Sequence, residues 1–383
     1  KRGACIMSKL LIEQFIEDHP NDWEVLLKKP PYCLKIFHEG DYTLFKYNHY
    51  DSIMREPIVQ EARGLIINMK TKKVVCHSFN KFFNYDDSNS KPINWNSAKV
   101  LDKIDGTLVN LWWDNNEWHW STNGNIDAFK GTTNIKADTF GNCIIRAITN
   151  EELTYDEFLS YFKPAYTYMF ELVTPANILV TKANEDKLYY LSCRNMITGK
   201  EEIKTVLPVI APKQYHFNNI KEVVEAANKF DDQHEGYVVV DNNYNRVKVK
   251  GKEFLKSFYI NNFQLSKHQL MDILLQKEVY NEFIKTFPQY IPALKDLEDK
   301  WNAINLEIKR ASDELKRIES ESPSVTRKQF FENVNKIQTV DFVKSYLLLD
   351  EEAQENYRER MRTDVYLDLN LIKKYNEYLA RKK

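Results

Sequence analysis

Short runs of alternating apolar and polar residues fill the chain from Tyr32 to Lys250 and predict β-strands, because successive side chains of a strand point to opposite faces. Turn-forming residues, as at 114–116 and 241–245, separate neighbouring runs and predict antiparallel hairpins. The Asp105-Gly106 pair predicts one more hairpin, between strands at 100–101 and 108–113. The other predicted strands are 42–47, 65–68, 74–77, 117–121, 166–173, 188–194, 235–240 and 246–250.

At both ends of the chain, apolar residues recur every three or four positions, which is the spacing expected for one face of an α-helix. Residues 9–27 predict a short amphipathic helix interrupted at His19-Pro20, and 294–318 predict one long helix after Pro292. Gly251 is the last glycine, and everything after it reads as helix. Shorter helices are predicted at 133–150, 154–162 with Thr154 as N-cap, 217–230, 328–349, 351–362 and 367–379.

The fold class is therefore α+β, an antiparallel-sheet domain over residues 7–255 followed by an all-α domain over 256–383. Residues 1–6 precede Met7, and we expect them to be a cloning remnant that plays no part in the fold.

Composition excludes several classes of protein. Among 383 residues the five cysteines are scattered without a Cys-x-x-Cys pair, which argues against a zinc site or a disulfide framework and favours reduced, cytoplasmic thiols. No apolar run approaches the roughly 20 residues of a membrane helix, so we expect no membrane association. The net charge of -1 does not by itself announce a nucleic-acid partner, so any basic surface must be local.

The first candidate for a catalytic residue is the lysine of Lys103-Ile104-Asp105-Gly106. A lysine held at a turn can act as a nucleophile once its amine loses a proton, which desolvation or cations such as Lys248 and Lys250 would assist by lowering its pKa. An ordinary exposed turn is the alternative reading of this tetrad.

Other charged residues stand in suggestive positions. Glu171 lies inside an apolar strand, where a carboxylate is costly unless it is paired or functional. Lys248 and Lys250 share one face of their predicted strand. Arg63 and Lys81 stand next to predicted strands, where a surface charge is the common role, and Arg194 fits either a sheet-edge charge or a site residue.

Taken in order, these stretches form a recognisable series: Glu61-Ala62-Arg63-Gly64, Lys81-Phe82-Phe83-Asn84, the Lys103 tetrad, Phe170-Glu171-Leu172-Val173 with Pro175-Ala176-Asn177, Glu235-Gly236-Tyr237-Val238, and Lys248-Val249-Lys250. Together they resemble the covalent nucleotidyltransferases, and most closely the phage RNA ligase 1 family. The resemblance covers about residues 42–255.

This resemblance implies a nucleotidyltransferase core and an ATP-dependent RNA ligase that joins a 5′-phosphate to a 3′-hydroxyl through lysyl-AMP and RNA-adenylate. It implies Mg²⁺, with Mn²⁺ as a substitute, and a partner that is single-stranded or broken-loop RNA, tRNA included, in RNA repair. A monomer in the cytoplasm, the host's if a phage encodes it, is expected. The implied catalytic residues are Lys103, Asp105, Glu171, Lys248 and Lys250; the implied nucleotide-binding residues are Tyr47, Arg63, Lys81, Lys103, Glu171, Glu235, Lys248 and Lys250; and Glu235 and Asp105 are implied at the metal.

Two departures keep rival functions open. Ile178 stands where the family commonly has arginine, and the loop at 121–124 lacks the family's lysines. A non-catalytic RNA-binding protein with a decayed ligase core would explain both. A DNA ligase or capping-type enzyme would share Lys103, but the oligonucleotide-binding barrel that should follow is not predicted. The absence of a Walker loop argues against a fused kinase.

Overall fold

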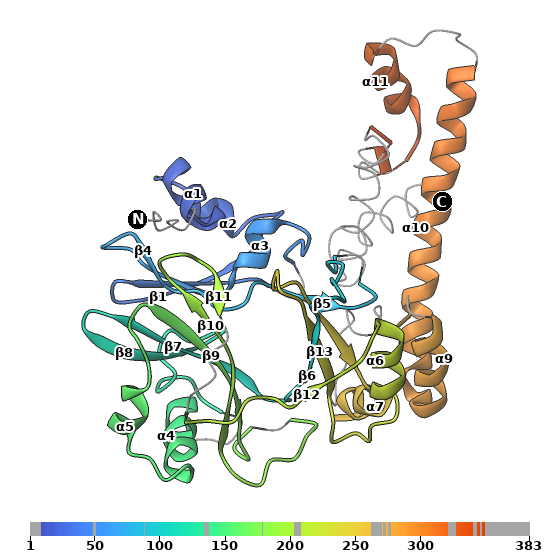
Figure 1. The fold of residues 1–383 in the computed structure, drawn as a ribbon. Coiled ribbons are helices and arrows are strands. Elements are labelled where there is room, and N and C mark those ends of the chain that lie inside the picture. Colours follow the sequence, from blue (N-terminus) through green and yellow to red (C-terminus); the bar gives the residue numbers. More distant parts are fainter. Residues whose placement is uncertain are drawn as a thin grey trace. The chain divides into compact units, whose positions relative to one another are not determined.

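A computed structural model describes residues 9–48, 51–87, 89–133, 138–177, 179–202, 208–261, 270, 273–274, 277–320, 327–339, 343–344 and 347–348. The chain divides into two compact units, Lys1–Asn261 and Asn262–Lys383. The first unit contains the described strands, and the described elements of the second are helices, which confirms the predicted α+β class (Figure 1).

Three sheets build the first unit (Figure 1). One has the antiparallel order β1 (Lys35–Glu39), β2 (Tyr42–Lys46), β3 (Arg63–Asn68) and β4 (Lys73–Cys76). The second has the order β11 (Glu201–Glu202), β10 (Lys187–Asn195), β9 (Tyr166–Val173), β7 (Thr107–Asp114) and β8 (Glu117–Thr122). In the third, β12 (Gln214–Tyr215), β6 (Lys99–Asp102), β13 (Gly236–Val240) and β14 (Arg246–Lys250) are antiparallel, and β5 (Phe83–Asn84) is parallel to β14.

Helices cover one face of each sheet. On the second sheet, α4 (Phe140–Asn150) and α5 (Tyr155–Ser160) bury Ile144 and Phe158 against Trp120 and Phe170, two aromatic side chains that each bury a large apolar area. Thr154 caps α5 as predicted. The other helices of this unit are α1 (Leu11–Asp18), α2 (Trp23–Leu27), α3 (Pro57–Glu61), α6 (Ile220–Ala227) and α7 (Lys252–Asn261).

The hairpins predicted at 114–116 and 241–245 are both present, as β7–β8 and β13–β14. Asn115 and Asn116 both have positive φ, 50° and 62°, as a two-residue turn between β7 and β8 requires. On β14, Val247 and Val249 are buried at 3% and 1% exposure, so Lys248 and Lys250 share the opposite face.

The predicted hairpin at Asp105-Gly106 is wrong. The strand before it, β6, belongs to the third sheet, and the strand after it, β7, belongs to the second. The chain crosses between sheets tightly against β9: a β-carbon on Gly106 would lie 2.6 Å from the Leu172 carbonyl oxygen, so no larger residue fits. Lys103 consequently lies where the two sheets meet.

The second unit contains α9 (Lys277–Thr286), a 3₁₀ turn (Pro288–Tyr290), α10 (Ile291–Ser320) and α11 (Arg327–Lys336). The 30-residue α10 confirms the predicted long helix, and its apolar stripe is buried at Leu294, Leu297, Ile304, Ile308, Ala311 and Leu315. The helices predicted at 351–362 and 367–379, like residues 1–6, lie outside the described residues.

Two further observations concern the described part of the chain. Cys33, Cys76, Cys143 and Cys193 form no disulfide among these residues. A membrane-crossing helix would need a longer apolar stretch than any helix there provides.

The left-handed backbone of Gly236 yields a prediction about stability. Its φ is +135°, and a β-carbon would lie 2.0 Å from the Val249 carbonyl oxygen. Gly236→Ala should therefore cost about 3 kcal/mol or more, from strain plus overpacking. Gly40→Ala is the matched control, because Gly40 also has positive φ but nothing lies within 4 Å of its β-carbon position. It should cost only about 1 to 2 kcal/mol. Thermal unfolding tests this, and equal melting temperatures for the two variants would contradict it.

Candidate active site

Lys103 and Lys250 share one buried carboxylate. The Glu235 side chain is 4% exposed, and its Oε2 lies 2.6 Å from Lys103 Nζ while its Oε1 lies 2.9 Å from Lys250 Nζ. The Lys103 backbone N–H donates to the Gly236 carbonyl at 2.9 Å, which fixes the lysine beside β13. The sheet pairing of Gly236 with Lys250 brings the second lysine to the same carboxylate.

The pKa of Lys103 is raised, which corrects the expectation that it would be lowered. Burial does lower it, but the negative charges of Glu235, Glu171 and Asp105 outweigh burial. The nearest charge partner of Lys103 is therefore an anion rather than a cation. For the same reason the pKa of Glu235 is lowered: burial opposes this, and Lys103 and Lys250 prevail.

Two more carboxylates lie close to Lys103. Burial raises the pKa of Glu171 to about 7, with Lys103 opposing and Glu235 adding to the shift. Burial and Glu235 also raise the pKa of Asp105, whose Oδ2 accepts a hydrogen bond from the Thr181 backbone N–H at 3.1 Å. A carboxyl group with a pKa near 7 can exchange a proton at neutral pH.

Lys248 lies among the other cations of the site. Burial lowers the pKa of Lys248 well below its ordinary value, and Lys81, Lys103, Lys250 and Arg63 add to this by repulsion. The sequence pattern suggested such repulsion at Lys103, whereas the structure places it on Lys248.

Lys81 and Arg63 both act on Tyr47. Lys81 Nζ donates to the Tyr47 hydroxyl at 3.4 Å, and the two cations lower the pKa of this tyrosine even though burial opposes them. The Arg63 guanidinium lies 5.1 Å from the Phe82 ring centre, and its buried Nη1 has no hydrogen-bond partner among the described residues. A buried cation with an unused donor is suited to bind an anion.

All the residues predicted for the site thus fall in one electrostatically connected group. They are Tyr47, Arg63, Lys81, Lys103, Asp105, Glu171, Glu235, Lys248 and Lys250. Their catalytic roles stay predictions. Ile178 lies outside the described residues.

Sequence reasoning missed Lys46. Its ammonium lies 3.3 Å from the position that a Gly124 β-carbon would occupy, so it supplies an amine to the loop at 121–124, which has no lysine of its own. Burial lowers the pKa of Lys46. Only the packing of the first sheet, which contains Lys46, against the second, which contains β8, brings this lysine to the loop, although its place at the end of a predicted strand was a signal.

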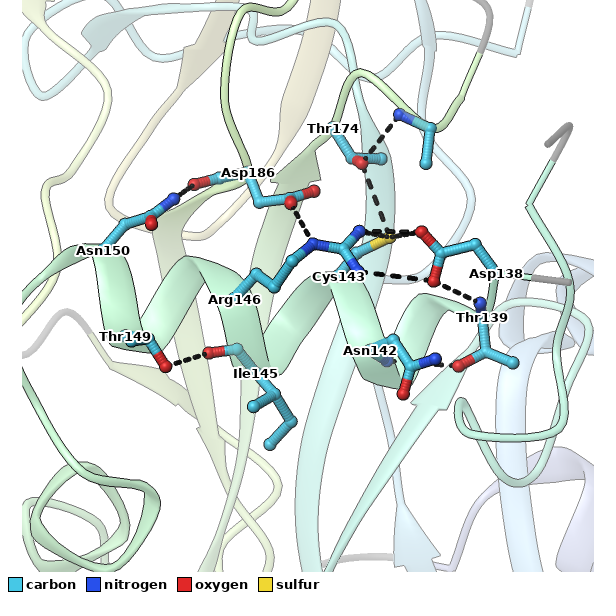
Figure 2. A network of polar contacts seen from close by, with 11 residues as sticks. Asp138, Thr139, Asn142, Cys143, Ile145, Arg146, Thr149, Asn150, Thr174 and Asp186 are labelled. Atoms are coloured by element: carbon cyan, nitrogen blue, oxygen red, sulfur yellow. Dashed lines mark hydrogen bonds and ion pairs between the residues drawn. The ribbon is translucent and has the colours of Figure 1, made fainter.

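Arg146 of α4 binds Asp186, at the end of the connection between β9 and β10 (Figure 2). The guanidinium lies 2.6 Å from the buried Asp186 carboxylate and 2.8 Å from that of Asp138. The same connection carries Thr181, the partner of Asp105. This network therefore supports the carboxylate side of the site from outside.

Two features bear on ligands. A cavity of about 280 Å³ opens beside Lys103, lined by Ile104, Val173, Tyr189 and His234 among others. No three His, Cys, Asp or Glu side chains of the described residues gather closely enough to hold a metal ion. With both Glu235 oxygens engaged by lysines, the site fits a largely hydrated Mg²⁺ better than a closed protein cage.

Comparison with known proteins identifies the family. A sequence model described as RNA ligase matches residues 61–261, the stretch that carries most of the site. The chain belongs to this RNA ligase family. The resemblance to the phage RNA ligase 1 family, drawn from the motifs, is confirmed, and with it the nucleotidyltransferase fold.

A viral protein is similar in sequence to most of this RNA ligase family member. A protein of Autographa californica nuclear polyhedrosis virus, described as a bifunctional polynucleotide kinase/RNA ligase, is 29% identical over 341 residues, which are 83% of this chain and 49% of that protein. The chain thus spans about half the length of this curated relative.

Among solved structures, an archaeal ATP-dependent RNA ligase is similar with a TM-score of 0.42 and 12% identity, over 94% of this chain and 80% of that one. A Naegleria gruberi RNA ligase variant solved with ATP and Mn is similar with a TM-score of 0.33 and 10% identity, over 43% and 52%.

The two lysines of β14 should respond oppositely to removal of their charge. Lys248→Met should stabilise the protein by about 1 kcal/mol, because burial and neighbouring cations disfavour its charge. Lys250→Met, the matched control two residues away, should destabilise it by about 1 to 3 kcal/mol, because Glu235 loses a partner. Denaturant unfolding at pH 7 measures both.

The direction in which stability changes with pH follows from the lowered pKa of Lys248. Since the pKa of Lys248 is lower in the folded chain than in the unfolded one, the native protein gains stability as pH rises from the folded pKa to the unfolded one. The advantage of Lys248→Met should shrink over that interval. Destabilisation of equal size in both variants would show that Lys248 is not under repulsion.

Proposed function

We propose that this protein is an ATP-dependent RNA ligase that joins RNA 5′-phosphate and 3′-hydroxyl ends. The observation that carries the proposal is Lys103 held on the buried Glu235 beside a surplus of cations, within the part of the chain that the family model matches. A buried lysine next to a polyanion-binding group is the arrangement that nucleotidyl transfer to an amine requires.

In the first step Lys103 Nζ attacks the α-phosphate of ATP. A phosphorus–nitrogen bond forms, the bond to the bridging oxygen of pyrophosphate breaks, and lysyl-AMP remains. The ammonium must first leave Glu235 and lose a proton. Glu171, with a pKa of about 7, is better matched to accept that proton at neutral pH than Glu235, whose pKa is lowered.

The cations stabilise the phosphates. Lys248 and Lys250 face the α-phosphate, where negative charge develops, and Arg63 and Lys81 hold the leaving pyrophosphate with Tyr47 beside them. An arriving triphosphate would relieve the repulsion at Lys248. A divalent cation, Mg²⁺ or in its place Mn²⁺, would neutralise phosphate oxygens, and Asp105 and Glu235 are the carboxylates proposed to hold its waters.

In the remaining steps AMP moves from Lys103 to the RNA 5′-phosphate, and the RNA 3′-hydroxyl then displaces AMP to form the phosphodiester. Single-stranded or broken-loop RNA, tRNA included, is the proposed substrate, in RNA repair by a monomer in the cytoplasm. Residues 7–255 would perform this chemistry. The helical residues 256–383 would help to choose the RNA, since the motifs all precede them; unchanged preference among structured RNAs after their removal would contradict this.

Incubation with α-³²P-labelled ATP tests the proposal. The label should stay on the denatured protein through an acid-labile bond, and Lys103→Ala should abolish it, because among the described residues Lys103 is the amine that contacts Glu235 Oε2. Lys163→Ala, which alters an exposed lysine, is the control and should label normally.

Four outcomes would count against the proposal. Full labelling of Lys103→Ala would remove Lys103 as the nucleophile. Labelling by GTP instead of ATP would favour a capping-type enzyme, and transfer only to DNA ends a DNA ligase. No labelling of the native protein would favour a non-catalytic RNA-binding protein.

A further inference from the structure

A second cation-rich cavity lies next to the site. It has a volume of about 670 Å³ and is lined by residues from four separate stretches of the first unit. Its cationic side chains are Lys81, Lys91, Arg194, Lys200 and Arg246, and Glu201 is the acid among the described residues that line it. Lys81 belongs both to this cavity and to the group around Tyr47.

Two arginines form its floor, the buried Arg194 and Arg246, whose side chain is 10% exposed. Glu201 lies between them, 3.1 Å from Arg194 Nη2 and 2.7 Å from Arg246 Nη2, so one carboxylate balances two guanidinium groups. Arg194 is 9% exposed, and its Nε has no hydrogen-bond partner in the described structure. Burial and the nearby Arg246 lower the pKa of Arg194. The floor therefore retains unneutralised positive charge.

Phe79 and Phe82 separate this floor from the cations of the active site. The Phe79 ring centre lies 4.4 Å from the Arg246 guanidinium and 5.9 Å from that of Arg63. The Phe82 ring centre lies 5.4 Å from Lys248 Nζ. Arg246 of the cavity and Arg63 of the active site thus contact the same Phe79 ring, so the two cationic groups are neighbours.

The polar rim indicates what kind of anion fits. Asparagine side chains at 80, 89, 242, 243 and 245 line the cavity together with Tyr244. An amide both donates and accepts hydrogen bonds, as the edge of a nucleobase does, and an aromatic ring can stack on a base. The Asn80 oxygen already pairs with His77, but the amide oxygens of Asn242 and Asn243 form no hydrogen bond with the described residues, and a pyrophosphate, which offers only acceptors, could not bond them. The cavity is suited to a nucleotide rather than to a bare phosphate group.

We propose that this cavity binds a nucleotide of the RNA strand that carries the 5′-phosphate, next to the end that receives AMP. The assignment rests on the proposed ligase function. In it, Lys81, Lys91 and Lys200 contact backbone phosphates, and the asparagines contact the base. Arg194, whose role the sequence left open, is a positioning residue that orients Glu201 and the floor.

Fluorescence anisotropy with a labelled, 5′-phosphorylated single-stranded RNA tests this, measured on the full chain at several salt concentrations. Lys91 and Lys200 are exposed, and their side chains form no hydrogen bond or ion pair with the described residues, so the Lys91→Ala/Lys200→Ala variant should fold normally. Its Kd should rise at least about fivefold, and the slope of log K against log salt should shrink by roughly 1.4, or about 0.7 for each phosphate that a lysine no longer neutralises. Asn243→Ala should weaken binding without changing the slope. Lys163→Ala should match the native protein.

The outcomes separate the possible occupants. Unchanged Kd and slope in the double variant would overturn the proposal, as would equal affinity of the native protein for a 5′-hydroxyl RNA of the same sequence, which would point to the other strand. Displacement of the RNA by inorganic pyrophosphate, with a raised KM for ATP in the double variant, would assign the cavity to the triphosphate. Failure of lysine labelling with RNA binding intact would reject the ligase function and leave the cavity's RNA site standing.

Discussion

The Glu235 carboxylate, buried between Lys103 and Lys250 at 2.6 and 2.9 Å, is the interaction on which the site depends. A buried ion needs its partners, because removing one leaves a charge that water cannot reach. The fold supplies both: β13 pairs with β6 on one side and β14 on the other, and Gly236 lets the backbone approach Val249 closely. Sheet pairing thus sets the position of the candidate nucleophile more than the turn that follows it.

Charges of both signs are concentrated around this interaction. Glu171 and Asp105 add carboxylates near Lys103 and their own pKa values are raised, whereas Lys81 and Arg63 add cations near Lys248 and help to lower its pKa. A site in which cations crowd one another is poised for a polyanion. The whole-chain charge of -1 conceals this, because acids elsewhere in the sequence cancel the local excess.

The features that the sequence predicted correctly are those that depend on residues close together in the chain. Strand alternation placed Lys248 and Lys250 on one face, the Asn115-Asn116 turn formed a hairpin, and the motif order identified the RNA ligase family. The sequence did not predict the features that depend on contacts between segments far apart in the chain. The partner that raises the pKa of Lys103 lies 132 residues away, the crossing at Gly106 depends on the backbone of β9, and Lys46 reaches its loop only through sheet packing. The roles of the site residues stay predictions.

The central claim is that Glu235 holds Lys103 charged until a nucleotide arrives, and titration of the Lys103 side chain by heteronuclear NMR tests it most directly. In the ligand-free protein its pKa should lie above the ordinary value of 10.5, because nearby carboxylates outweigh burial. In Glu235→Gln it should fall, because the carboxylate charge that raises it is gone. A Lys103 pKa below 10.5 in the native protein, or one that Glu235→Gln does not alter, would contradict the account.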